Sequence, residues 1–301
     1  MRRFPLSLAG LWLALFILQP AQAEAQLELL QLSACRTTNS FMLLRGEGLQ
    51  PEHQQRYDGD RAALQAAFAQ LAPDNQQALQ QPYQQLLASL AEGQTFGPRE
   101  DDLPWQYPGQ LSRALVGLLE AAEARDGQTP ETPLGTALKL EYLATQYVGQ
   151  AYLGYFEITP SPDAHYVNQS GEQLLASLDN EMGQAMPLLE QQIPGQERRV
   201  QADWRYLRAA LGDFDNAGRA RLGRSGKPLV PLVISRHARS LSERLAALPG
   251  GQACSGVSSR CTLTVAPMDS RPGYSVASAA EPRVQGDGHE HGRLSRPPAA
   301  L

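Results

Sequence analysis

Residues that can bind metals gather near the C-terminus: Asp287, His289 and His291, with Glu290 as an alternative source of a carboxylate oxygen. In an extended chain, side chains at positions i and i+2 project to the same side. Two imidazoles and a carboxylate could therefore converge on zinc or copper. A flexible peptide holds no preformed site, so binding would be weak. A solvated tail without bound metal is the commoner outcome of such a cluster, and we favour it. Weak binding of zinc or copper by the tail is the alternative, and no other cofactor is expected.

A second candidate is His237, which lies between Arg236 and Arg239 in a helical pattern. Histidine transfers protons near neutral pH, so His237 could act as a general base. With Arg205 and Arg208 from the preceding pattern, it could instead form a face that binds anions. A histidine at the edge of a packed helix is the commoner outcome of such a pattern, and we favour it.

Tyrosines are the third candidate group, because Tyr147, Tyr152 and Tyr155 cluster at the end of the pattern from 134 to 156. A tyrosine buries its ring and keeps a hydroxyl for a polar partner. Such a group fits a packed core with internal hydrogen bonds, which is the commoner case. It also fits the wall of a ligand pocket, so the predicted ligand-binding residues are these tyrosines together with Arg236 and His237.

Acidic residues give the only hint of hydrolysis. Glu100, Asp101 and Asp102 are adjacent in a loop, and cleavage of a glycosidic bond needs only two suitably separated carboxyl groups. A solvated acidic loop is the commoner explanation of such residues, and we favour it. The sequence has no nucleophile elbow, zinc-protease motif, phosphate-binding loop or dinucleotide fingerprint. We therefore expect a protein without catalytic activity, and a hydrolase of envelope polymers is the alternative.

The N-terminus resembles a secretory signal peptide. Arg2 and Arg3 precede an apolar run over 11–18, followed by Pro20 and the small-residue pattern of 21–23. This order predicts cleavage after Ala23 and export to a periplasm or to the outside of the cell. The sequence of 32–35 also fits a lipoprotein cleavage box, but it lies beyond the apolar run and inside a helical pattern, so we do not assign a lipid to Cys35.

Export also bears on the three cysteines. An oxidising compartment favours a disulfide between Cys254 and Cys261, which are close in a Gly- and Ser-rich segment. Cys35 is then unpaired. It falls near the apolar face of a helical pattern, so a buried, inert thiol is expected.

These candidate residues must be positioned by helices, since apolar residues recur every three or four positions through most of the chain. The first such stripe comprises Leu27, Leu30, Ala34, Thr37, Phe41 and Leu44. The patterns predict an all-α, multi-helix bundle of about seven helices with a disordered C-terminal tail. The predicted organisation is a signal peptide (1–23), a helical bundle domain (24–251), a small segment closed by the disulfide (252–265) and a disordered tail (266–301).

Three local expectations can be checked directly. The second helix is expected to start near Asp60, and the third to kink or restart at Pro82, which lacks an N–H group. A loop is expected over 92–110, held to the body of the protein by Trp105 and Tyr107.

Composition narrows the partners. The chain has 26 basic and 31 acidic residues, a formal net charge of −5, and loss of Arg2 and Arg3 with the signal makes the remainder more acidic. This balance argues against a nucleic-acid partner and against an anionic membrane surface. No run beyond the signal is long and apolar enough to embed the mature chain in a membrane. The expected function is that of an exported helical bundle that binds a small ligand or a periplasmic protein.

Overall fold

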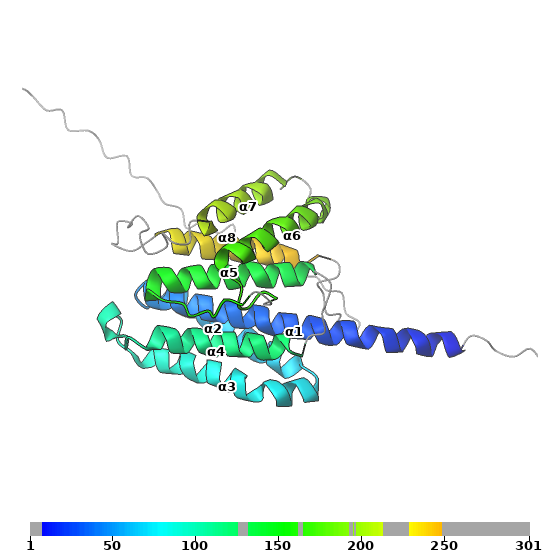
Figure 1. The fold of residues 1–301 in the computed structure, drawn as a ribbon, viewed down its shortest axis with the longest axis horizontal. Helices are drawn as coiled ribbons and strands as arrows, with labels where there is room; N and C mark the ends of the chain where they lie inside the picture. The colour runs from blue at the N-terminus through cyan, green and yellow to red at the C-terminus, as the bar shows by residue number, and fades with distance from the viewer. Residues whose placement is uncertain are drawn as a thin grey trace, which may run out of the picture. The chain divides into compact units, whose positions relative to one another are not determined.

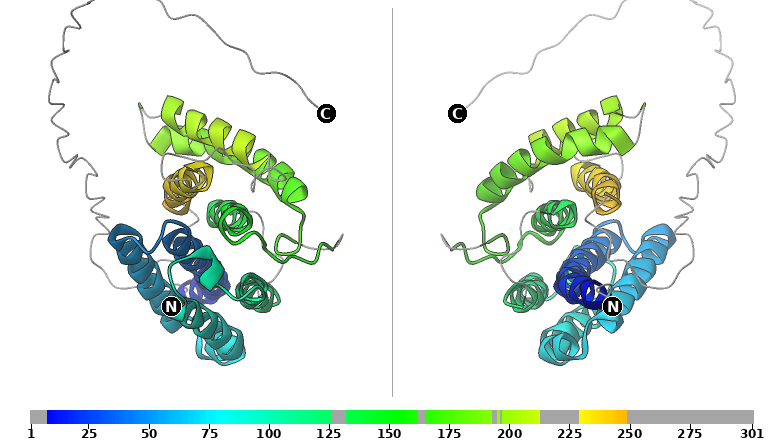
Figure 2. Two further views of the ribbon diagram at one scale, coloured as in Figure 1. Left: turned by 90° about the vertical axis from the view of Figure 1, so that its left-hand side faces the viewer. Right: turned by 90° about the vertical axis from the view of Figure 1, so that its right-hand side faces the viewer.

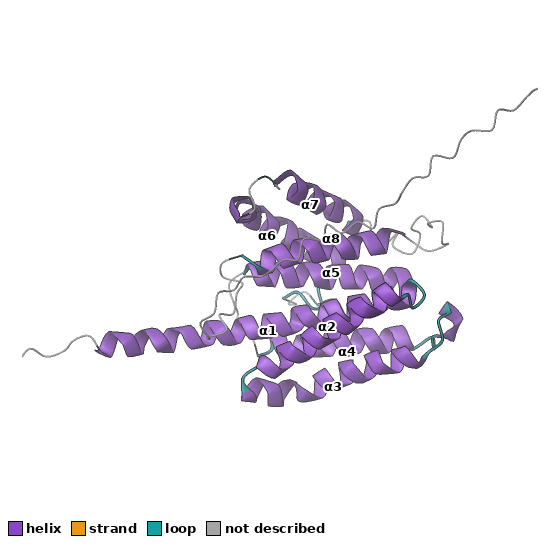
Figure 3. Ribbon diagram, turned by 180° about the vertical axis from the view of Figure 1, so that it is seen from behind, coloured by secondary structure: helices purple, strands orange, loops and turns teal. Residues whose placement is uncertain are grey.

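The computed structural model describes residues 8–125, 132–161, 165–192, 195, 197–212 and 229–248. Within these ranges every regular element is a helix, as Figure 1 and Figure 3 show. The described elements are α1 (Leu8–Gly46), α2 (Pro51–Gln70), α3 (Pro73–Thr95), the 3-10 helix η1 (Glu100–Asp102), α4 (Tyr107–Glu123), α5 (Pro133–Leu153), α6 (Gly171–Gln192), α7 (Glu197–Leu211) and α8 (Leu229–Ala246). The all-α prediction is confirmed, with eight α-helices described where about seven were expected.

Helix α1 is the centre of the bundle. It packs against α2, α4 and α5, while α8 packs on α5 and α7. Figure 1 and the end-on views of Figure 2 show α3 and α4 on one side of α1, and α8 followed by α6 and α7 on the other. All six residues of the predicted apolar stripe are buried, which explains the position of α1: Leu27, Leu30, Ala34, Thr37, Phe41 and Leu44.

Helix boundaries follow from proline and capping residues. Pro51, Pro73 and Pro133 occupy the first turns of their helices, where a missing N–H group costs nothing. At the start of α5, the Thr132 hydroxyl accepts a hydrogen bond from the Gly135 amide at 2.8 Å. At its end, Gly154 adopts φ 70°, a left-handed conformation that glycine accommodates without strain.

Two boundary expectations were wrong. Helix α2 begins at Pro51 rather than near Asp60. Its first two turns are largely polar, with Tyr57 as their one buried side chain, so they carry no apolar period. At Pro82 a kink or a restart was expected, and the restart is wrong, because one helix, α3, runs from Pro73 to Thr95 with Pro82 inside it.

The connection between α3 and α4 is shorter than expected and spans 96–106. Trp105 does not hold it to the body, because its side chain is 91% exposed. Tyr107 does: it is buried, its hydroxyl donates to the Ser89 carbonyl at 2.9 Å, and its ring meets Phe96 edge-to-face. One apolar ring is sufficient to close the loop, and the indole of Trp105 is left in solvent.

The structure also bears on the cysteines and on membrane spans. Cys35 is a free, buried thiol, as predicted, and burial raises the pKa of this thiol well above its usual value. Cys254, Cys261, the segment 252–265 and the tail 266–301 lie outside the described residues. Among the helices in the described ranges, none combines the length and apolar character that crossing a bilayer requires.

Candidate functional site

A buried carboxylate joins three helices of the bundle. Glu141 of α5 is only 1% exposed. Its Oε1 accepts hydrogen bonds from Arg36 Nε of α1 at 3.1 Å and from Ser242 Oγ of α8 at 2.6 Å. Arg239 Nε of α8 lies 3.2 Å from the same oxygen. A buried charge must be paired to be tolerated, and here two arginines share one carboxylate.

A second ion pair ties α8 to α2. The Arg239 guanidinium donates to both carboxylate oxygens of Asp60, from Nη1 at 2.8 Å and from Nη2 at 2.9 Å. Burial alone would lower the pKa of Arg239, but Glu141 and Asp60 outweigh burial and raise that pKa. The guanidinium is therefore held as a fixed cation in this geometry.

The direction of α8 follows from two bonds to α1. Arg36 Nη2 donates to Ser242 Oγ at 2.7 Å, whereas Asn39, further along α1, accepts from Ser235 at 2.7 Å. Between these two contacts the residue number rises along α1, from 36 to 39, and falls along α8, from 242 to 235. The two helices are therefore antiparallel. Helix α2 is also antiparallel to α1, because a short turn joins them. Helices α2 and α8 consequently run in the same direction where Asp60 and Arg239 meet.

Helices α2 and α8 each carry three titratable residues at the same spacing. On α2, His53, Arg56 and Asp60 occupy positions i, i+3 and i+7, and on α8 the same spacing holds Arg236, Arg239 and Glu243. Residues at this spacing share one helix face. We call these six residues, with Arg36 and Glu141 beneath them, the charged seam. The sequence analysis had selected only Arg236 and Arg239 from this set.

Arg56 differs from the other buried cations of the seam. It is half-buried and has no ion pair or hydrogen bond with any residue in the described ranges. Burial is the largest influence that lowers its pKa, followed by the like charge of Arg239, while Asp60, Glu141 and Glu243 partly oppose both. A half-buried cation without a direct partner is unusual, because its loss of hydration is not offset by an ion pair.

His53 lies one turn before Arg56, towards the start of α2. Burial lowers the pKa of His53, Glu47 and Glu52 act in the opposite direction, and Arg56 and Arg236 lower the pKa further. The imidazole is therefore disposed to be neutral near pH 7, where it offers one N–H donor and one nitrogen acceptor.

An unmatched polar atom lies on α1 beneath α8. Asn39 is buried, and its Oδ1 is bonded to Ser235, but its Nδ2 has no partner among the described residues. Because a serine hydroxyl both donates and accepts, one amide atom of Asn39 is left over in either orientation of the amide.

The three candidate tyrosines do not converge on one site. Tyr147 is buried in the core, as the commoner interpretation held. The Tyr152 ring lies over Gly46 and its hydroxyl donates to Glu47 Oε1, so it fastens the end of α5 to the end of α1. Tyr155 is 50% exposed. Burial, and the hydrogen bond to Glu47, raise the pKa of the Tyr152 hydroxyl, so that it remains protonated.

His237 faces away from the seam, towards α7. Its Nδ1 lies 3.0 Å from Asp203 Oδ1, and the ring of Tyr206 lies 5.2 Å away. Its direct partner is a carboxylate of α7 rather than the flanking arginines of α8. The pair joins two adjacent helices, which agrees with a histidine at the edge of a packed helix.

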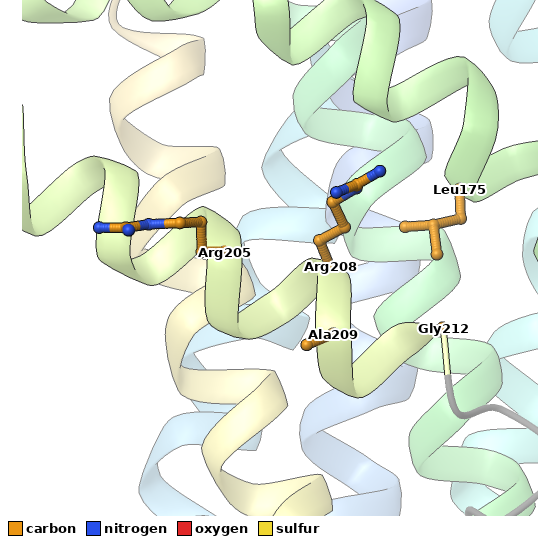
Figure 4. Close-up of a pocket in the computed structure, with 5 residues that line it drawn as sticks. All are labelled: Leu175, Arg205, Arg208, Ala209 and Gly212. Carbon is orange, nitrogen blue, oxygen red and sulfur yellow. The ribbon is translucent and has the colours of Figure 1, made fainter.

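Arg205 and Arg208 do not join Arg236 and Arg239 in one anion-binding face. They line an open cavity of about 490 Å³ between α6 and α7, together with Leu175, Ala209 and Gly212 (Figure 4). Figure 4 shows Arg208 beside Leu175 and Arg205 extending away from both. Arg208 is already paired with Asp179 at 2.9 Å, while Arg239 points to α2.

The acidic loop has a structural role. Asp102 accepts a hydrogen bond from the Arg99 amide at 2.9 Å, and this bond is the largest influence that lowers the pKa of Asp102. Asp102 therefore stays ionised and is unsuited to be a general acid. Asp101 is exposed on η1 beside it. Asp102 therefore does not provide the protonated carboxyl group that glycoside hydrolysis requires, and the side chain of Glu100 lies outside the described part of the structure.

No group of three His, Cys, Asp or Glu side chains in the described part of the chain could hold a metal ion. The predicted ligands Asp287, His289 and His291 lie outside that part.

One sequence signal could have found the seam. Residues 36–40 of α1 read Arg-Thr-Thr-Asn-Ser, a run of polar residues between the apolar residues 34–35 and 41–44. Polar residues at the centre of an apolar helix indicate partners on the neighbouring helices.

Comparison with known proteins adds no relative: the chain matches no described protein family, no curated protein and no solved structure.

Proposed function

We propose that the protein is an exported, non-catalytic helical bundle that binds a small ligand at the charged seam. The observation that carries this proposal is Arg56, a half-buried arginine without an ion pair or hydrogen bond in the described ranges. Its neighbour Arg239 is fixed by two carboxylates. A charge that lowers stability in the free protein is typical of sites that are completed by a ligand.

The arrangement favours binding over catalysis. The two carboxylates of the seam that are shielded from solvent, Asp60 and Glu141, are both held in ion pairs with arginine, and the third, Glu243, is exposed. An ion-paired carboxylate is a poor proton donor and a poor base, since the arginine stabilises its charged form. The remaining groups suit recognition of a polar ligand by charge and hydrogen bonds.

The position of α1 supports export with loss of the first 23 residues. Among the residues of α1 whose burial the structure describes, 23–46, the buried part begins at Leu27, four residues beyond the proposed cleavage point. The earlier part of the helix runs past the ends of the neighbouring helices in Figure 1. Cleavage after Ala23 would therefore remove no residue of the packed stripe, and it would place the acidic Glu24 at the new helix N-terminus, where a negative charge is favourable.

Native mass spectrometry of the protein purified from a periplasmic fraction tests both the binding of a ligand and the cleavage after Ala23. We expect a chain that begins at Glu24 and carries additional mass from a bound ligand. The additional mass should disappear in Arg56→Gln and persist in Arg61→Gln, which changes a partly exposed arginine of the same helix that lies 3.8 Å from Asp58 and over the Tyr57 ring.

The same experiment separates the tail from the seam. A chain that ends at Pro282 lacks Asp287, His289 and His291, so additional mass that depends on these residues would identify metal bound to the tail and contradict a ligand at the seam. A bare chain in every sample would also contradict the proposal, and a chain that begins at Met1 would contradict cleavage.

A further inference from the structure

We infer that the ligand of the seam carries a single carboxylate group, which binds to the guanidinium of Arg56. This inference rests on the proposed function and adds the chemical class of the ligand. It is argued from the positions and pairing of the charges in the seam.

The first step is the balance of charge. Arg36 and Arg239 are the two cations whose ion pairs are formed, and Glu141 and Asp60 are their two carboxylate partners. These four groups cancel. Arg236 and Glu243, both exposed on α8, add one charge of each sign. The seam is then left with one net positive charge, and half-buried Arg56 is its cation without an ion pair in the described ranges, so a ligand with one negative charge would neutralise the seam.

The second step is geometry. Arg56 and Asp60 are one turn apart on α2, and Asp60 is bound by Arg239 from α8. Arg56 is thus on the face of α2 that α8 approaches, where the like charge of Arg239 acts on it. An anion beside Arg56 would offset this repulsion. A guanidinium presents parallel N–H donors that match the two oxygens of a carboxylate.

The third step decides between oxyanions. Asp60, Glu141 and Glu243 all act on Arg56, so negative charge is already present around it. A phosphate, which carries between one and two charges at neutral pH, would experience more of this repulsion than a carboxylate with one. Neutral His53, one turn away on α2, could donate an N–H hydrogen bond to a ligand oxygen without adding charge. The seam therefore favours a monovalent carboxylate over phosphate.

The test is an NMR titration of the full chain labelled with ¹⁵N-arginine. The Nε–Hε signal of Arg56 is assigned as the one lost in Arg56→Lys. Sodium acetate and inorganic phosphate are each added at constant ionic strength, with sodium chloride as the reference. We expect acetate to give a saturable shift of the Arg56 signal at millimolar concentration, phosphate to bind at least tenfold more weakly, and the Arg61 signal to follow chloride.

Other results would overturn the inference in distinguishable ways. Phosphate binding as tightly as acetate would reject the choice of carboxylate. If Arg56 responds to neither anion but the native ligand mass still depends on Arg56, the proposed function stands and the ligand has a different chemistry. If Arg56 responds to neither anion and no ligand mass is found, both proposals fail. Arg56→Gln should remain folded because it breaks no ion pair in the described structure, so loss of the ligand mass in this variant reports binding.

Discussion

Arg239 of α8 binds both carboxylate oxygens of Asp60 on α2, at 2.8 and 2.9 Å, although 179 residues separate the two in the chain. The two helices have little direct packing with each other, since α2 packs mainly on α1 and α8 packs mainly on α5. The ion pair therefore fixes the position of two helices that share little apolar surface. It also determines which groups face each other across the seam.

Glu141→Gln should be one of the most destabilising single changes in the bundle. It leaves Arg36 and Arg239 without the carboxylate that they share at 3.1 and 3.2 Å. Removing one partner of a buried ion pair costs about 3 kcal/mol or more, since the remaining charge is still desolvated. Urea unfolding followed by circular dichroism measures this loss.

Glu92→Gln is the matched control for that change. Glu92 is exposed on α3, and a surface substitution of this kind changes the free energy of unfolding by about 0.5 kcal/mol or less. Equal stability of the two variants would show that the Glu141 network contributes nothing beyond a surface carboxylate.

Two glycines in helices should respond oppositely to alanine. A Cβ atom at Gly93 of α3 would overlap the Tyr107 hydroxyl and the Phe41 ring, so Gly93→Ala should destabilise the protein by about 1–3 kcal/mol. At Gly117 of α4 nothing lies within 4 Å of the added Cβ. Gly117→Ala should stabilise it by about 0.5–1 kcal/mol, because alanine loses less conformational entropy in a helix. Thermal unfolding of both variants checks the signs, and a stabilising Gly93→Ala would refute the close packing around Tyr107.

Substitution of the tyrosines separates a structural role from ligand binding. Tyr152→Phe removes the hydroxyl that donates to Glu47 and should cost about 1 kcal/mol. Tyr155→Phe, at a half-exposed side chain, should change stability by less than about 0.5 kcal/mol. Neither variant should lose the ligand mass that depends on Arg56. Loss of that mass in Tyr155→Phe would instead restore the tyrosines as ligand-binding residues.

His53 predicts a loss of stability in mild acid. Burial holds its pKa in the folded protein below the usual 6.5, so the unfolded chain takes up a proton first as the pH falls. The contribution of neutral His53 to the free energy of unfolding is therefore fully present above about pH 6.5. It decreases as the pH falls below that value. Urea unfolding at about pH 7.5 and about pH 5.5 should show a smaller decrease for His53→Gln than for the parent chain. The same decrease in both would contradict this assignment.

The prediction of individual elements succeeded where apolar residues formed a clear period. The stripe on α1 is buried at every predicted position, and the proposed interpretation of Cys35 followed from it. Prediction failed at the start of α2, whose polar first turns carry no such period, and at Trp105, whose large apolar ring suggested burial. An aromatic residue in a loop is buried only when a surface is available to receive it, and Tyr107 already occupies that surface.

The amino-acid sequence by itself determined the all-α class and most helices, because a helix that faces a core repeats its apolar residues every three to four positions. Only the tertiary structure brought Arg36, Asp60, Glu141 and Arg239 together, since they come from four helices and have no common spacing along the chain. It likewise separated Arg236 and His237, adjacent in sequence, onto the α2 and α7 sides of α8. Pairing of charges depends on which helix faces meet, and those contacts are decided by the packing of the whole bundle.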